Sequence, residues 1–502
     1  MKGGHEENDA SSVYRGDQKE ACMGRRIHGI KWLSPSDVDK IHDCSLEILW
    51  ERGIRIQHPR ALSLLADAGA KIDDSTKMVH LPPKLVEKCL QNVPREFVLG
   101  GLTPEWDLRV GSNSGPFVRS SGGAEGYFDL RTRVYRRTTL DDLKEWTRLL
   151  DGLPNVTICG GFSPTDVPGE FRDVLVVKTM MEHSAKHLFL NPSNYTDLKA
   201  IIDMGLAIRG DKNALKERPP ITCLTSVTSP ADVLDYCVDV LLLSGEYGLP
   251  VEVNSTPIMG GTSPVTLAGC VLQANLEILA LVVISQLANP GAPLIHRGIT
   301  MGMDMGSGMG LSGSIESGMA QAALTQVARE KYQMPVTAFG MTTDALIADG
   351  ESQIERTAQT LLAALADASI LAGAGTLESF YCVDPVQLTI DDEILGLVFR
   401  ALRGLQVDEE TLAKDLIKNM GPGGNYLAEE HTIEHHRSEH WRPTCFNRHS
   451  RADWKLNGAK EMERLAQERA INILRDRPEP VLEKHVQKEL DNIYEALVAG
   501  RL

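Results

Sequence analysis

Two short apolar runs in the middle of the chain carry side chains of the kinds that bind small charged ligands. Glu252 and Asn254 lie in the run 250–256, where every second residue shares one face of a strand. Glu252 either attracts a cation such as an ammonium group or makes a buried structural hydrogen bond. His296 and Arg297 lie in the run 293–300. Arg297 either clamps a carboxylate with two parallel hydrogen bonds or forms a salt bridge to a neighbouring helix.

Three further acidic residues are candidates for the same site. Glu316 and Glu378 follow turns rich in Gly and Ser, and Asp344 comes just after the apolar run 334–341. The carboxylates of Glu316 and Glu378 either line the site or stabilise the N-terminus of a helix.

Aromatic residues make up only 5% of the chain, so those that gather near strand ends are informative. Phe339, Phe380 and Tyr381 lie at the ends of late apolar runs, and Tyr127 and Phe128 are further candidates. Aromatic faces bind quaternary ammonium groups well. The alternative is that these rings plug a barrel.

Two other segments resemble metal sites at first sight. The tract 431–441 contains His431 and His435 at a spacing of four, but it does not match the zinc motif H-E-x-x-H. We therefore favour a structural or interface role for it and expect no bound metal. The Met-rich loop 301–309 is interpreted as a flexible wall of the site.

These residues must be positioned by a repeated unit of a short apolar run, a loop of small residues and a helical segment. Such a repeat is typical of βα alternation. An open doubly wound sheet usually has fewer strands and a G-x-G-x-x-G turn, which the first loop lacks. We expect a (β/α)8 TIM barrel, whose sites lie at the C-terminal ends of the strands. The eight predicted strands are 116–123, 156–162, 186–191, 220–226, 250–256, 293–300, 334–341 and 368–375.

Helices are expected around and outside the barrel. Thr139 is predicted to open one over 143–150, and Ser229 before Pro230 to act as the N-cap of another. We divide the chain into a mobile tail at 1–25, an N-terminal helical region at 26–110, a barrel core at 111–390 and a C-terminal helical extension at 391–502. Predicted helices outside the barrel are 34–53, 58–68, 81–90, 391–402, 409–419, 458–476 and 479–499. The extension could cover a barrel end or form a subunit interface.

Composition narrows the range of partners. A net charge of -16 repels phosphate backbones, so nucleic acid is not expected as a partner. The longest apolar stretch, 264–288, contains Gln273, Asn275 and Glu277, which would be costly in hydrocarbon, so we expect a core helix rather than a membrane span. The polar N-terminus lacks the apolar region of a signal peptide, and the nine cysteines form no C-x-x-C pair. We expect a cytoplasmic protein with reduced thiols.

Several segments, in a consistent order, carry a resemblance to a known family. They are GGTSPVTLAG at 260–269, SIE at 314–316, TTDA at 342–345, GAGTLES at 373–379 and WRP at 441–443, together with 122–129, 138–142 and 431–432. Together they resemble the trimethylamine methyltransferase family. The founding enzyme of that family carries pyrrolysine in its barrel, whereas the segment near 341–348 holds only ordinary residues here. The resemblance is therefore to the branch without pyrrolysine, which includes glycine betaine:corrinoid methyltransferase.

The resemblance implies methyl transfer from a small quaternary amine, glycine betaine first, to Co(I) of a separate corrinoid protein. A quaternary amine already carries its charge and leaves as a neutral tertiary amine, so it needs no pyrrolysine. The alternatives are the same reaction on carnitine, proline betaine, butyrobetaine or another N-methyl compound, and a chain that binds a quaternary amine without catalysis. The chain lacks the D-x-H-x-x-G motif of corrinoid-binding modules. Cobalamin is therefore expected on a carrier protein docked at the barrel mouth, with no tightly bound cofactor, and the enzyme is expected to be a homo-oligomer.

Overall fold

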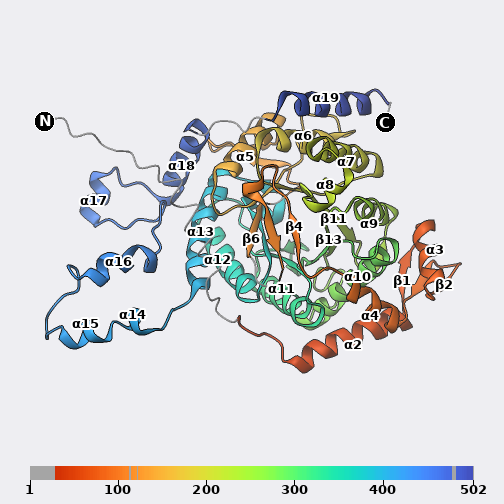
Figure 1. Ribbon diagram of the computed structural model, residues 1–502, viewed down its shortest axis with the longest axis horizontal. Helices are drawn as coiled ribbons and strands as arrows, with labels where there is room; N and C mark the ends of the chain where they lie inside the picture. Colours follow the sequence, from red (N-terminus) through yellow and green to blue (C-terminus); the bar gives the residue numbers. More distant parts are fainter. Residues whose placement is uncertain (1–28, 112–114, 121, 477–481, 501–502) are drawn as a thin grey trace.

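The computed structural model describes residues 29–111, 115–120, 122–476 and 482–500. Eight parallel strands close into a barrel, which confirms the predicted fold, and each lies within or overlaps a predicted run (Figure 1). In chain order the strands are β6 Phe117–Ser120, β9 Ile158–Gly160, β10 His187–Leu190, β11 Ile221–Val227, β13 Val251–Ser255, β14 Leu294–Gly298, β17 Val336–Phe339 and β18 Ile370–Ala374. The predicted tail at 1–25 lies outside the described residues.

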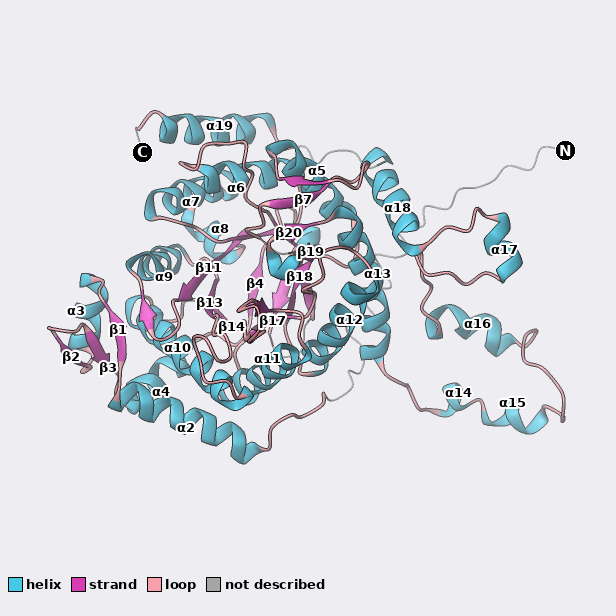
Figure 2. Cartoon of the chain, turned by 180° about the vertical axis from the view of Figure 1, so that it is seen from behind, coloured by secondary structure: helices cyan, strands magenta, loops and turns pink. Residues whose placement is uncertain are grey.

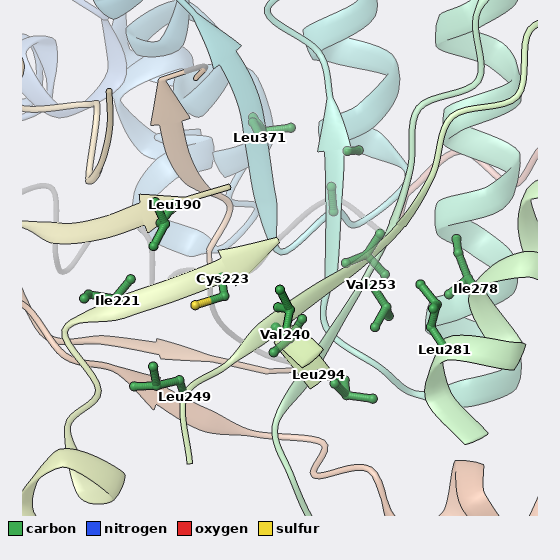
Figure 3. Close-up of a cluster of buried hydrophobic side chains, with 14 of the residues drawn as sticks. Leu190, Ile221, Cys223, Val240, Leu249, Val253, Ile278, Leu281, Leu294 and Leu371 are labelled. Atoms are coloured by element: carbon green, nitrogen blue, oxygen red, sulfur yellow. The ribbon is translucent and has the colours of Figure 1, made fainter. Parts of the chain in front are cut away.

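Each barrel strand is followed by a helix on the outside of the barrel. These helices are α5 Leu140–Gly152, α6 Arg172–His183, α7 Tyr195–Arg209, α9 Asp235–Tyr247, α10 Leu267–Ala288, α11 Ile315–Val327, α12 Gly350–Leu365 and α13 Pro385–Arg403, with the short α8 Lys212–Glu217 after α7. Apolar residues such as Cys223 and Val253 on the strands pack against Val240 of α9 and Ile278 and Leu281 of α10 (Figure 3). The main core of the protein is this layer between strands and helices.

Helix α10 is long and apolar enough to cross a membrane, but 78% of its apolar window is buried inside the protein. It packs against α2, α4, α9 and α11. The structure thus agrees with a core helix in this segment. The buried carboxylate of Glu277 in this helix accepts hydrogen bonds from Ser229, Ser255, Gln273 and the amide of Ala231.

Local contacts explain why one helix begins where it was predicted and why the helix start predicted at Ser229 was wrong. The Thr139 hydroxyl accepts a hydrogen bond from the Asp142 amide at 3.2 Å, and the Asp142 carboxylate accepts one from the Thr139 amide at 2.8 Å, which forms a capping box for α5. Ser229 is not an N-cap, because α9 begins only at Asp235. The residues between them form β12 Asp232–Val233, which pairs with β1 Ile54–Ile56.

The N-terminal end of the barrel is closed by a hairpin. Its strands are β4 Phe97–Leu99 and β5 Leu108–Val110, with the 3-10 turn η1 Pro104–Trp106 between them. Leu99, Leu108 and Val110 pack with Phe189 and Ile295 from the inside of the barrel. This apolar plug leaves the C-terminal mouth as the face through which a ligand would enter.

The predicted N-terminal helices are present as α2 Pro35–Glu51, α3 Pro59–Asp67 and α4 Pro83–Asn92. Sequence reasoning missed the sheet that accompanies them, in which β1, β2 Lys71–Asp73, β3 Met78–His80 and β12 pair in the order β12-β1-β3-β2. Strands of two or three residues are too short to show an alternating pattern.

Short strands and turns lie at the mouth of the barrel, beyond the C-terminal ends of its strands. They are the hairpin β15 Gly302–Met303 and β16 Gly310–Leu311, the sheet formed by β7 Gly126–Phe128, β8 Tyr135–Arg137, β19 Thr376–Leu377 and β20 Cys382–Val383, and the 3-10 turn η3 Glu378–Phe380. The π-helical turn η2 Ala328–Tyr332 extends α11 on the outside.

The C-terminal extension has two parts. Helices α18 Met462–Asp476 and α19 Lys484–Val498 return to the barrel, where α18 packs on α13 and α5 and α19 packs on α7 and α6. Helices α14 Glu409–Leu412, α15 Lys414–Asn419, α16 Glu430–Glu439 and α17 Arg451–Leu456 project to one side, as Figure 2 shows. The single helix predicted at 409–419 is split into α14 and α15 at Ala413, whose φ is 47°.

Candidate active site

The inward side chains of three strands meet in a buried charged layer. Arg119 lies on β6, Glu252 on β13 and Arg297 on β14, and alternate residues of barrel strands face the interior. The Glu252 carboxylate lies 3.3 Å from Arg119 Nη2 and 3.3 Å from Arg297 Nε, and it accepts a hydrogen bond from Thr337 Oγ1 at 2.8 Å. All three charged residues are at most 4% exposed.

This layer contains two cations and one anion. Among the described residues, Arg119 Nε and both Nε and Nη1 of Arg297 are buried without a hydrogen-bond acceptor. Arg297 Nε is near enough to Glu252 for an ion pair but is not aligned for a hydrogen bond. Buried donors without acceptors are costly, so an anionic ligand group would both satisfy them and balance the charge.

Burial shifts the acidity of both guanidinium groups. It lowers the pKa of Arg297 to about 9, while Glu252 opposes the shift and Arg119 adds to it. Burial likewise lowers the pKa of Arg119, against the effect of Glu252. At neutral pH Arg297 still carries its proton, so the layer keeps a net positive charge.

Aromatic rings flank the two arginines. The Arg119 guanidinium carbon lies 3.6 Å from the centre of the Phe189 ring, and that of Arg297 lies 4.8 Å from the centre of the Phe339 ring. Such stacking holds the planar guanidinium groups in place. Phe380 contacts Phe339 edge to face, with ring centres 4.9 Å apart.

An apolar layer lies next along the strands toward the mouth. Ile299 and Phe339 come two residues after Arg297 and Thr337, and they pack with Ala372, Met301 and Phe380. A ligand held by the arginines would therefore place its other end among apolar and aromatic groups at the mouth.

Asp344 and its neighbours hold two loops of the mouth together. The Asp344 carboxylate accepts hydrogen bonds from the amides of Ser312 and Gly313 at 2.8 and 3.0 Å and from the hydroxyl of Ser379. Asp344 thus links the loops that follow β14, β17 and β18. With its oxygens occupied in this way, Asp344 shapes the mouth instead of offering a free charge to a ligand.

The turn after β19 has an uncommon backbone. Glu378, Ser379 and Phe380 have φ values of 52°, 48° and 81°, and left-handed geometry is costly for residues other than glycine. This geometry positions the Phe380 ring against Phe339. Partial burial raises the pKa of the Glu378 carboxyl, which lies near Tyr135 and Cys382.

A buried ion pair supports the same loops from behind. Arg356 Nη1 lies 3.0 Å from Asp391 Oδ2 and donates to the carbonyl of Met341 at 2.7 Å. The Asp391 carboxylate accepts a hydrogen bond from the Gly375 amide at 2.6 Å. Arg356 and Asp391 therefore fix the loops that carry Asp344 and Phe380.

The remaining predicted residues lie apart from the charged layer. His296 faces outward toward Tyr332, with ring centres 6.3 Å apart, and burial lowers its pKa to about 3. We therefore no longer propose it as a substrate contact. Glu316 is exposed in the first turn of α11, and Tyr381 is 70% exposed on the rim. Tyr127 packs against Phe162, and α16 carries His431 and His435 in the projecting part of the extension.

Asn254 faces the interior beside Glu252. Its amide nitrogen donates to Ser226 Oγ at 2.8 Å and Thr256 Oγ1 at 2.9 Å, and its Oδ1 is buried without a donor among the described residues. Sequence reasoning missed Arg119 and Phe189, which stack on each other in the same interior. The signal for Arg119 was available, since it lies in the first predicted strand on the face opposite Val118.

Comparison with known proteins identifies the family. Residues 1–496 match the family described as trimethylamine methyltransferase (MTTB). The chain belongs to this family. It is 32% identical over 458 residues to trimethylamine methyltransferase MttB of Desulfitobacterium hafniense, covering 91% of this chain and 92% of that relative. It is 28% identical over 482 residues to a glycine betaine methyltransferase of the same species, covering 95% and 98%.

Solved structures support the fold of this methyltransferase. The monomethylamine methyltransferase MtmB of Methanosarcina barkeri matches with a TM-score of 0.53 at 13% identity, and the match covers 92% of each chain. The family assignment makes the protein an enzyme that transfers methyl groups.

Proposed function

We propose that this methyltransferase demethylates a small quaternary amine that also carries a carboxylate, with glycine betaine as the first candidate and dimethylglycine as its product. The buried layer of Arg119, Glu252 and Arg297 supports this proposal, because two guanidinium groups face one carboxylate and retain N–H donors that have no acceptor among the described residues. A betaine carboxylate would complete the layer with charge-assisted hydrogen bonds.

The order of the layers supports one orientation of such a substrate. The carboxylate would lie on Arg119 and Arg297, and the ammonium would lie toward Phe339 and Phe380 at the mouth. Aromatic faces bind quaternary ammonium groups and exclude water from them. The methyl group to be transferred would then point out of the barrel. Glu252 is engaged by the arginines, so its first role is to hold them rather than to attract the ammonium.

The methyl acceptor is proposed to be a corrinoid held by a separate carrier protein. When bound at the mouth, it supplies a Co(I) nucleophile for the methyl group. The mouth fits a large partner, because loops after β13, β14 and β17 expose apolar residues that include Val265, Met305 and Leu346. The Met-rich loop 301–309 contributes Met305 and Met309 to this rim.

The residues of this chain have clear tasks in that reaction. Arg119 and Arg297 bind and orient the substrate, and the apolar layer around Phe339 excludes water at the reacting methyl. The breaking bond joins carbon to nitrogen, and the nitrogen keeps the electron pair and leaves as a neutral tertiary amine. No proton has to move, which agrees with a site that lacks a free acid at this layer among the described residues.

We also propose a cytoplasmic location. The eight cysteines among the described residues are all free, while Cys22 lies outside them. Free thiols of this kind support a reducing compartment.

The second candidate substrate is trimethylamine, which the names of several relatives favour. Trimethylamine has no anionic group, so it would leave Arg119 Nε and both Nε and Nη1 of Arg297 without an acceptor among the described residues. Other carboxylated amines, namely carnitine, proline betaine and butyrobetaine, would satisfy the arginines as well and differ in the length of the chain between the two charges.

The test is a methyl transfer assay with the purified enzyme, a corrinoid protein reduced to Co(I) and a panel of amines. We expect cobalt methylation, followed by absorbance, with glycine betaine or another carboxylated quaternary amine. Turnover of trimethylamine or tetramethylammonium, with none of the carboxylated amines, would refute the proposal. Calorimetric binding of betaine without methyl transfer would instead support the alternative of a binding protein.

A further inference from the structure

The part of the C-terminal extension that projects from the barrel is hereafter the arm, residues 404–460. It contains α14, α15, α16 and α17, and both views show it standing away from the barrel (Figures 1 and 2). Leu405, Leu427 and Leu456 on the arm are 86%, 82% and 84% exposed. Val407, Leu412, Ile417, Tyr426 and Ile433 are exposed as well.

The arm is not expected to be stable when it is exposed to water on all sides. Its helices have four to ten residues, and isolated helices of that length are not stable without packing. Concentrated exposure of large apolar side chains marks a surface that another protein covers. The arm therefore requires a partner.

The charges of the arm are separated along its length. Residues 404–434 carry seven Asp and Glu against two Lys, whereas residues 435–460 carry six Lys and Arg against two Asp and Glu. The whole arm is described, and the one ion pair between the halves joins His435 to Glu410 at 3.4 Å. The lysines and arginines of the second half make no ion pair with an acid of the first half.

Most of the exposed apolar side chains of the arm lie in its acidic half, and Leu456 is the exception in the basic half. The exposed Leu405, Leu412, Ile417 and Leu427 all lie in the acidic half. The basic half contributes to a surface depression lined by Phe446, Arg451, Trp454 and Lys460, which continues to Met462 and Leu465 of α18. This half is anchored to the barrel, because Thr444 donates its amide and hydroxyl hydrogens to Glu393, both at 2.6 Å.

We propose that the arm binds a second copy of this chain, with the acidic half of each arm on the basic half of the other. A twofold pair requires a surface that is complementary to itself, and the arm combines an acidic half rich in exposed apolar side chains with a basic half that borders a depression. A corrinoid carrier would need both features on its own surface and would have to reach the barrel mouth as well. The second copy is the partner that supplies both halves by symmetry.

The test uses two charge-reversal variants of the full-length chain. The first is Glu409→Lys with Asp415→Lys in the acidic half, and the second is Arg448→Glu with Lys455→Glu in the basic half. All four side chains are exposed, so their reversal should leave the fold intact. The matched control is Lys71→Glu with Lys84→Glu, two exposed residues of the N-terminal region.

Light scattering after size-exclusion chromatography should show a dimer or another even-numbered assembly for the natural chain and the control. Each arm variant alone should associate at least about tenfold more weakly, because the reversal changes the net charge of one half from -5 to -1 or from +4 to 0 and so weakens both contacts. An equimolar mixture of the two variants should recover much of the assembly, since one contact of each mixed pair then joins two unaltered halves.

Three results would overturn the proposal. They are a monomeric natural chain, arm variants that assemble as well as the natural chain, and a mixture that stays dissociated. Arm variants that assemble normally but lose methyl transfer to the carrier would assign the arm to the carrier instead.

Discussion

Replacing Arg297 by Met is the sharpest test of the carboxylate subsite. The change keeps much of the length of the side chain but removes the guanidinium group, including the Nε and Nη1 donors that lack acceptors in the described residues. It also lowers the charge of the buried layer from one net positive charge to zero. Glu252 keeps Arg119 and Thr337 as partners, so the fold should survive.

The size of the effect follows from the lost hydrogen bonds. A hydrogen bond to a charged group contributes about 1.5–3 kcal/mol, and about 1.4 kcal/mol corresponds to a tenfold change in rate. We expect kcat/KM for glycine betaine to fall by about ten- to a hundredfold in Arg297→Met. Because Arg119 lies in the same layer, Arg119→Met should give a loss of the same order.

The assay compares glycine betaine with tetramethylammonium, which has the cationic end but no carboxylate. Arg297→Met should lose activity on the betaine and retain any activity on tetramethylammonium. His296→Gln is the matched control, since His296 is the next residue on β14 and faces outward. If Arg297→Met folds, as circular dichroism would show, and keeps its betaine kcat/KM, the carboxylate is bound elsewhere and the subsite is wrong.

Three further predictions concern the same layer and its supports. The pKa of Arg297 is about 9, so kcat/KM for betaine should stay level below pH 9 and decline above it as the cation is lost, and a level profile to pH 10 would contradict this. Glu252→Gln should cost about 3–5 kcal/mol of stability by leaving two buried cations unbalanced, and betaine should raise its melting temperature more than that of the natural enzyme. Arg356→Met should lower the free energy of unfolding by about 3–5 kcal/mol, measured by denaturant titration, whereas Arg356→Met with Asp391→Leu should lose less because no buried charge is left unpaired.

Much of the fold could be predicted because short sequence patterns mark the strands and helices of the barrel. Apolar runs that alternate with loops of small residues identified all eight strands, and the Thr139 capping box located α5. The period-2 pattern of 250–256 also placed Glu252 and Asn254 inside the barrel. In contrast, β1, β2 and β3 are too short for any pattern, and the helix expected at Ser229 was displaced by pairing of β12 with a strand 177 residues away.

The sequence by itself determined which residue types reach the barrel interior, because strand periodicity depends only on neighbours in the chain. Only the tertiary structure decided their partners. Arg119 and Arg297 are 178 residues apart in the sequence, yet closure of the barrel brings both to Glu252. The same closure turns His296 away from its neighbour Arg297 and leaves guanidinium donors that have no acceptor in the part of the chain that the structure describes. Such long-range contacts depend on the register around the whole barrel, which no local pattern contains.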